Sequence, residues 1–189
     1  MYAHETIELE QHGNFIKQTY RNRCYIAGAN GKQSLNIPII HTGKGTPVPY
    51  TEVQIDFAEP WASNHLKSIK SAYNSSPFYQ FYEDEIHDLF QNIPEFLFEW
   101  NVKTLRFILN HVGYDHQITG THEFQNNNLA NRLITAKKKQ TTLLNPYIQV
   151  FQEKYGFMQP LSGLDLLFNL GPSAISYLKN QSHNLDAQY

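Results

Sequence analysis

QTYRNRCYIAGANGKQSLNIPII, at residues 18–40, is the stretch that decides the fold class. Near its middle lies Asn30-Gly31, a pair typical of a tight hairpin turn because both residues tolerate positive φ. The sequence therefore predicts a strand over 18–27 and an antiparallel return strand over 33–40. Pro38 has no backbone N–H to donate, which places the return strand at a sheet edge or ends it there.

Apolar and polar residues alternate on either side of this hairpin, which predicts further strands. The segment 6–11 alternates through Ile7 and Leu9, and the segment 51–57 places three apolar side chains on one face. A short strand is also expected near 116–123. The first third of the chain is therefore expected to hold antiparallel strands and a hairpin.

After Pro60 the apolar spacing becomes helical, with residues recurring three and four apart. Ser162 with Asp165 three residues later resembles a capping box, which marks the start of a helix. The predicted helices cover 61–73, 78–92, 94–112, 146–155, a short segment after Ser162 and a last one after Gly171-Pro172. We expect one α+β domain over 1–189, mainly helical in its C-terminal two-thirds, with 181–189 as a frayed tail.

Length and composition restrict the class of protein. The chain has 189 residues, a net charge of -2 and a single cysteine, Cys24. The near-neutral charge argues against nucleic-acid binding, although Lys137, Lys138 and Lys139 form a short basic run. The sequence contains no apolar run of about 20 residues that could span a membrane and no signal peptide at its start. The cytoplasm is therefore the expected location.

Two arginines form the first candidate site. On a strand, Lys17, Arg21 and Arg23 would share one face, because side chains alternate. Guanidinium groups two positions apart suit a phosphate or a carboxylate, since each offers several planar donors. The alternative is a solvated strand face whose arginines pair with acidic neighbours.

A helical row holds the second candidate. His65, Ile69 and Tyr73 are four residues apart, so they would lie along one side of a helix. If that side faces a pocket, His65 is the best general base in the chain, because its ordinary pKa lies near neutrality. The alternative is a histidine that bonds backbone groups beside an aromatic core patch. Cys24 alternates with Ile26, which favours a core thiol over a nucleophile.

The remaining histidines match no metal-binding motif, so we expect no metal site, and the sequence indicates no cofactor.

Four segments together resemble the WbqC-like protein family, from about residue 6 to about residue 178. They are KQTYRNRCYI, GANGKQSLNIPI, the helix of Trp61, His65 and Tyr73 with SSPFYQFYEDEI, and YIQVFQEKYGFMQPLSGLDLLFNLGP. The resemblance implies a link to bacterial surface-polysaccharide gene clusters, in which acylated amino sugars are made. It brings no settled mechanism. It marks as motif positions Arg21, Asn22, Arg23, His65, Tyr73, Ser76, Phe78, Asp165 and Asn169.

Relatives typically open with a further proline- and tyrosine-rich segment, whereas Met1 here lies almost at the first strand. The resemblance therefore implies a shortened start or a start codon assigned too late. A pocket that such a segment lines would be incomplete in this chain.

The first functional hypothesis is an enzyme, or accessory enzyme, that transfers an acyl or aminoacyl group to a nucleotide-linked amino sugar. His65 would be catalytic, and the substrate-binding residues would be Arg21, Asn22, Arg23, Tyr73, Ser76 and Phe78. The expected ligand is a nucleotide sugar or another anionic small molecule. The second hypothesis is a non-catalytic binding or assembly protein that forms homo-oligomers through its aromatic helices, with Phe78 and Phe81 in the contact.

Overall fold

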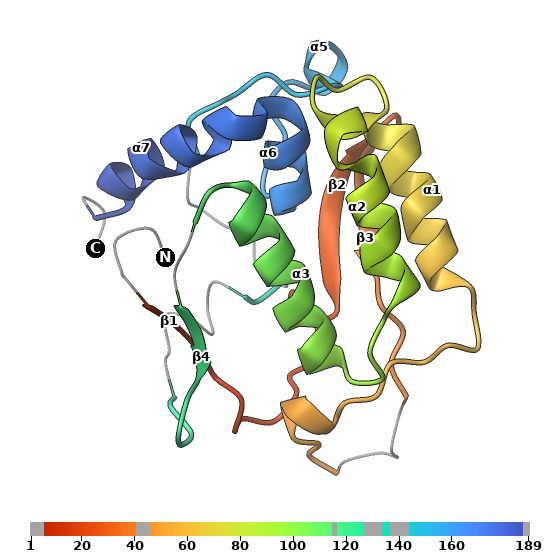
Figure 1. Ribbon diagram of the computed structural model, residues 1–189, viewed down its shortest axis with the longest axis vertical. Coiled ribbons are helices and arrows are strands. Elements are labelled where there is room, and N and C mark those ends of the chain that lie inside the picture. Colours follow the sequence, from red (N-terminus) through yellow and green to blue (C-terminus); the bar gives the residue numbers. More distant parts are fainter. Residues whose placement is uncertain (1–5, 41–45, 115–116, 127–133, 137–143, 187–189) are drawn as a thin grey trace.

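The computed structural model describes residues 6–40, 46–114, 117–126, 134–136 and 144–186, with side chains as far as Gln181. Three short strands lie in the first 36 residues, a fourth follows α3, and helices dominate the rest of the described chain, so the fold is α+β, as the sequence predicts (Figure 1). The strands are β1 (Thr6–Leu9), β2 (Arg23–Gly28), β3 (Gly31–Asn36) and β4 (Gln117–Gly120). The helices are η1 (Tyr50–Glu52), α1 (Trp61–Tyr73), α2 (Tyr79–Gln91), α3 (Leu97–His111), α5 (Gln152–Tyr155), α6 (Gly163–Leu170), η2 (Gly171–Ser173) and α7 (Ala174–Asp186).

The predicted hairpin is present, with its turn one residue earlier than expected. Strands β2 and β3 pair antiparallel, and Gly28 opposite Gly31 is the last pair before the turn. The turn residues are therefore Ala29 and Asn30, and Gly31 begins β3 with a φ of 96°. The return strand ends at Asn36 instead of residue 40, because Pro38 cannot donate to a ladder.

The segment before β2 corrects the strand prediction for residues 18–27. Residues 17–22 form turns apart from one isolated antiparallel bridge between Thr19 and Thr135, and Gln18 has a φ of 61°. The hydroxyl of Thr19 donates to the carbonyl of Ile16 at 2.8 Å, a local bond that competes with a strand ladder. Lys17, Arg21 and Arg23 therefore do not alternate on one strand face, and Lys17 is exposed.

The segment 51–57 is also not a strand. After η1, only Gln54 and Ile55 make isolated bridges, to Phe96 and Ile39 respectively. Gln54 and Ile55 pair with two different segments, and each of these segments contributes a single bridge residue, so no continuous ladder forms. Val53 and Ile55 are nevertheless buried as their alternation predicts, whereas Phe57 is exposed.

Strand β1 pairs in parallel with β4, which lies more than 100 residues later in the sequence, and Ile7 is opposite Ile118. The expectation of antiparallel N-terminal strands therefore holds for the β2–β3 hairpin and not for β1. Burial of Ile7 against the α3 and α6 side chains stabilises this pair.

Helix α1 has the predicted bounds, and α2 and α3 lie within theirs. Helix α3 begins at Leu97, after Pro94, and the predicted helix 146–155 is reduced to α5. Ser162 caps α6 by accepting from the Leu164 N–H, but the Asp165 carboxylate bonds elsewhere and closes no capping box. The backbone of α7 continues to Asp186, past the point where a frayed tail was expected.

Helix α6 is the centre of the fold, and it packs against β2, α2, α3 and α7 (Figure 1). Its fully buried Phe168 lies against the rings of Tyr73 and Tyr79, with centroids 5.0 and 5.3 Å away. Helices α1 and α2 flank the hairpin side of this core.

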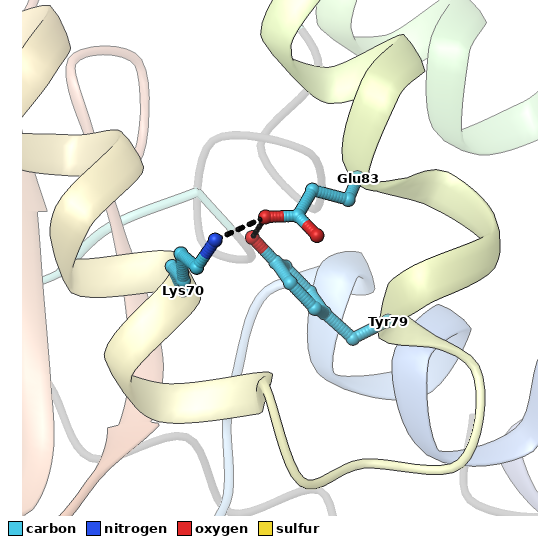
Figure 2. Close-up of polar contacts among 3 residues, drawn as sticks. All are labelled: Lys70, Tyr79 and Glu83. Atoms are coloured by element: carbon cyan, nitrogen blue, oxygen red, sulfur yellow. Dashed lines mark hydrogen bonds and ion pairs between the residues drawn. The ribbon is translucent and has the colours of Figure 1, made fainter.

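Helices α1 and α2 are also joined at the surface (Figure 2). Lys70 Nζ lies 2.7 Å from Glu83 Oε1, and the Tyr79 hydroxyl donates to the same oxygen at 3.4 Å. Because Lys70 is exposed, the pair contributes little to stability.

Candidate functional site

A cavity of about 440 Å³ lies between the β2–β3 hairpin and helices α1, α2 and α3. Its volume falls within the range of about 300–1,000 Å³ that small-molecule sites occupy. The polar residues that line it include Tyr20, Arg21, Arg23, Tyr50, His65 and Asn101.

Three predicted site residues line this cavity together: Arg21, Arg23 and His65. They come from the turn before β2, from the first residue of β2 and from α1. The other four predicted residues, Asn22, Tyr73, Ser76 and Phe78, are not among its lining residues.

Arg21 is held in place by α3 and by the first residue of η1. The Asn101 Nδ2 donates to the Arg21 carbonyl at 2.6 Å and to the Tyr50 hydroxyl oxygen at 2.5 Å. The Arg21 guanidinium lies over the Tyr50 ring, with Cζ 5.1 Å from its centroid. These contacts fix the backbone and the direction of the side chain, so the group is preorganised.

The guanidinium groups have unused donors. Arg21 Nη1 and Arg23 Nε are buried, and neither has a hydrogen-bond partner within the described part of the chain. Neither arginine forms an ion pair with a described acid. Burial lowers the pKa of Arg21, partly offset by Tyr50 and by the carboxylate of Glu10, yet arginine stays charged. The cavity therefore presents buried positive charge that can accept an anion.

His65 lies in the same wall with a defined tautomer. Its Nε2 is 3.0 Å from the Asn36 carbonyl oxygen, which can only accept, so Nε2 carries the proton. Burial lowers the pKa of His65, which favours the neutral ring, and Nδ1 has no hydrogen-bond partner among the described residues. The ring packs edge-on against Trp61 at 5.1 Å. A neutral imidazole beside buried guanidinium groups can serve as a base.

Asn22 and Tyr73 have structural contacts instead. The Asn22 side chain donates to the Ile37 carbonyl at 3.1 Å and thereby extends the hairpin. Tyr73 is fully buried, and its hydroxyl accepts from the Ala27 N–H at 3.1 Å and donates to Asp165 Oδ1 at 2.8 Å. Both hydrogen-bonding roles of the hydroxyl are thus used within the core.

Ser76 and Phe78 lie at the junction between α1 and α2. The Ser76 hydroxyl donates to the Tyr73 carbonyl at 2.7 Å, which satisfies a group at the end of α1. The Phe78 ring lies so close to Gly171 that a Cβ there would be 2.5 Å from a ring carbon. These positions therefore fix the course of the chain around α6.

Cys24 lines this cavity and an adjoining one, and its surroundings disfavour the thiolate form. Burial raises the pKa of its thiol to about 11, although a hydrogen bond with the Ser162 side chain acts in the opposite direction. Its side chain is half-buried and packs against the core beside Ile26, so it lies at the boundary between the core and the cavity.

Sequence reasoning missed the residues that position Arg21, namely Tyr50 and Asn101. A signal for Asn101 exists: Asn101 and Thr104 are polar residues within the apolar row of α3 that contains Trp100 and Ile108. Polar residues inside such a row call for a partner. Tyr50 has no comparable signal, because it begins the single turn of η1 and its contacts are with residues distant in the sequence.

A second cavity, of about 310 Å³, adjoins the first. Four residues line both cavities: Tyr20, Arg23, Cys24 and Ser162. Tyr25 also lines the second cavity, and its ring lies 6.1 Å from that of Tyr20, edge to face. Arg23 is therefore available to ligands on both sides of the start of β2.

The described residues contain no cluster of His, Cys, Asp or Glu that could hold a metal ion. No helix among them is long and apolar enough to cross a membrane. The lysine run at 137–139 lies outside the described residues.

Comparison with known proteins identifies a family and no individual relative. No curated protein and no solved structure matches the chain significantly. A model of the WbqC-like protein family matches residues 1–150, which is more than half of the chain and contains Arg21, Arg23 and His65. The matched range ends before α6, so the closing motif around Asp165 lies beyond it. The chain is a member of the WbqC-like protein family.

Proposed function

We propose that the larger cavity binds an anionic substrate and that the chain transfers an acyl or aminoacyl group to a nucleotide-linked amino sugar in bacterial surface-polysaccharide biosynthesis. The observation that carries this proposal is that one cavity is lined by a neutral imidazole and by two arginines, each with a buried nitrogen that has no hydrogen-bond partner among the described residues. Two such donors suit a phosphate or carboxylate, because charged hydrogen bonds of this kind are among the strongest in proteins.

The proposed reaction needs a base and an activated acyl donor, a thioester or an acyl phosphate. The amine nitrogen of the sugar attacks the acyl carbon and forms the C–N bond. The bond from that carbon to the leaving sulfur or oxygen breaks, and the leaving group departs with the electron pair. His65 Nδ1 takes the proton released by the amine and passes it to the leaving group.

Two adjoining cavities suit a reaction with two substrates. Arg23 and Tyr20 line both, so an anionic group placed between them can be held while each substrate occupies its own side. The aromatic rings of Tyr20 and Tyr25 offer a surface for the nucleobase of a nucleotide-linked sugar.

Binding of the acceptor is tested by thermal unfolding. A panel of uridine diphosphate amino sugars at millimolar concentration is expected to raise the Tm, because a ligand at 100 times its Kd stabilises the folded state by about 2.7 kcal/mol. For a chain of this length that corresponds to an upward shift of roughly 5–10 °C. No shift across the whole panel would contradict the proposal.

The role of His65 is tested by His65→Gln. The amide of glutamine can still donate to the Asn36 carbonyl, so substrate affinity and stability are expected to change little, whereas transfer should slow by about 10²–10⁴-fold. The measurement is product formation by mass spectrometry, together with ligand affinity by calorimetry. Transfer at the wild-type rate in this variant would exclude His65 as the base.

A second candidate function is assembly through the aromatic helices. Phe81 on α2 is 75% exposed, and its ring lies 6.1 Å from the tilted ring of Phe78, so the two form an apolar patch at the start of that helix. Light scattering decides between the two candidates, since a monomer at all concentrations would remove this one.

A further inference from the structure

The cavity has two chemically different walls. The polar residues Arg21 and Arg23 come from the turn and first strand position at 21–23. The rest of the lining is mostly hydrocarbon, contributed by α1, α2 and α3, and includes Ile69, Ile86, Leu89, Phe90, Trp100 and Phe107. The site is therefore charged on one side and apolar on the others.

The apolar walls do not suit a sugar ring. A sugar carries several hydroxyl groups, and each one buried without a partner weakens binding by tenfold or more. Helices α1, α2 and α3 offer few polar partners to this cavity, namely His65 on α1 and Asn101 and Thr104 on α3. The Asn101 Nδ2 already donates to Arg21 and Tyr50. A hydrocarbon or aromatic group needs no such partners and gains from leaving water.

We infer that the interior of the cavity binds the aliphatic or aromatic chain of an activated acyl donor, whose phosphate is held by Arg21 and Arg23. This inference rests on the proposed anion site and deepens it by naming the donor as a hydrophobic acyl compound. The amino sugar then lies outside the apolar interior, beside the second cavity. The volume of about 440 Å³ accommodates a group of about 10–15 non-hydrogen atoms, if each occupies about the volume of a water molecule.

Alkyl phosphates of increasing length test the inference by calorimetry, at concentrations below micelle formation. From butyl to octyl phosphate the Kd is expected to fall about fourfold per added methylene, and then to level off at about 8–10 carbons as the cavity fills. Inorganic phosphate and octyl glucoside serve as the charged probe without a chain and the chain without a charge. Both are expected to bind at least tenfold more weakly than octyl phosphate.

A cavity-filling variant ties the effect to this cavity. Leu89 is half-buried in the wall, so Leu89→Trp should weaken octyl phosphate binding tenfold or more and leave butyl phosphate within about twofold. If this variant does not fold, the series on the unaltered protein decides alone. The measured quantity is again the Kd.

The outcomes separate this inference from the proposed function. A Kd that does not depend on chain length overturns the inference, and so does equal binding of octyl phosphate and octyl glucoside. Binding of uridine diphosphate amino sugars without any chain-length dependence would leave the proposed function standing. Chain-length dependence without any effect of these sugars would support the inference and contradict the proposed acceptor.

Discussion

Replacing Arg21 with methionine is expected to stabilise the ligand-free protein by about 1–2 kcal/mol and to weaken anion binding by about 10- to 100-fold. The opposite signs have one cause. In the free protein the buried Arg21 Nη1 has no partner among the residues that the structure describes, and an unsatisfied buried donor lowers stability. When an anion is bound, the same donor gains a charged hydrogen bond, which is worth roughly 1.5–3 kcal/mol.

Methionine is the appropriate replacement because it keeps the packing. The Arg21 side chain lies over the Tyr50 ring, and a thioether also makes favourable contacts with aromatic rings. The loss of the cation–π contact, worth about 0.5–1 kcal/mol, is thereby partly offset. Only the donor and the charge are removed from the cavity wall.

Arg106→Met is the matched control, because Arg106 is exposed on α3 and does not line the cavity. It removes the same charge and is expected to change the free energy of unfolding by less than about 0.5 kcal/mol and to leave anion affinity unchanged. Urea unfolding and calorimetry with octyl phosphate measure the two quantities. An Arg21→Met variant that is less stable and binds anions normally would remove Arg21 from the proposed site.

Replacing Asp165 with alanine is expected to destabilise the protein by about 3–5 kcal/mol, a large part of the roughly 5–15 kcal/mol typical of a domain. Asp165 is fully buried in α6. Its carboxylate accepts from the Tyr73 and Tyr147 hydroxyls at 2.8 and 2.5 Å and from the Gln149 amide at 3.0 Å. These three hydrogen bonds join α6 to α1 and to the segment before α5. Alanine would leave their three donors without an acceptor in the core.

Two further variants serve as comparisons for this prediction: Asp165→Asn, which changes the network only in part, and Lys70→Met, which is a surface control. Asparagine keeps one acceptor oxygen and should lose roughly half as much stability, whereas Lys70→Met removes only an exposed surface pair and should lose little. The measurement is the urea midpoint of each variant. Equal midpoints for the alanine variant and the unaltered protein would show that this network does not hold the core together.

The pH dependence of stability follows from the same carboxyl. Burial outweighs the three hydrogen bonds and raises the pKa of Asp165 above its ordinary value of 3.8. The folded state therefore binds the proton more tightly than the unfolded state, so the contribution of this group is greatest below pH 3.8 and falls as pH rises through the raised pKa. Asp165→Asn is expected to flatten the stability curve in that window.

The sequence by itself determined the features that local chemistry specifies. The bounds of α1 follow from its apolar spacing between Pro60 and the Asn74 turn, and Ser162 caps α6. The hairpin follows from the Asn30-Gly31 pair, although its turn shifted by one residue. Helical spacing, caps and turn residues act within a few positions, so they can be read from adjacent letters.

Only the tertiary structure decided which side chains share the cavity. Arg21 and Arg23 were placed on a strand by alternation, but a turn before β2 carries Arg21, and their common exposure to the cavity depends on α3. Tyr73, which lies in the same helical row as His65, instead faces Asp165 in the core. A helical row indicates which residues are neighbours but not what it faces, because that depends on partners far away in the chain. For the same reason the parallel pairing of β1 with β4 could not be predicted from either strand alone.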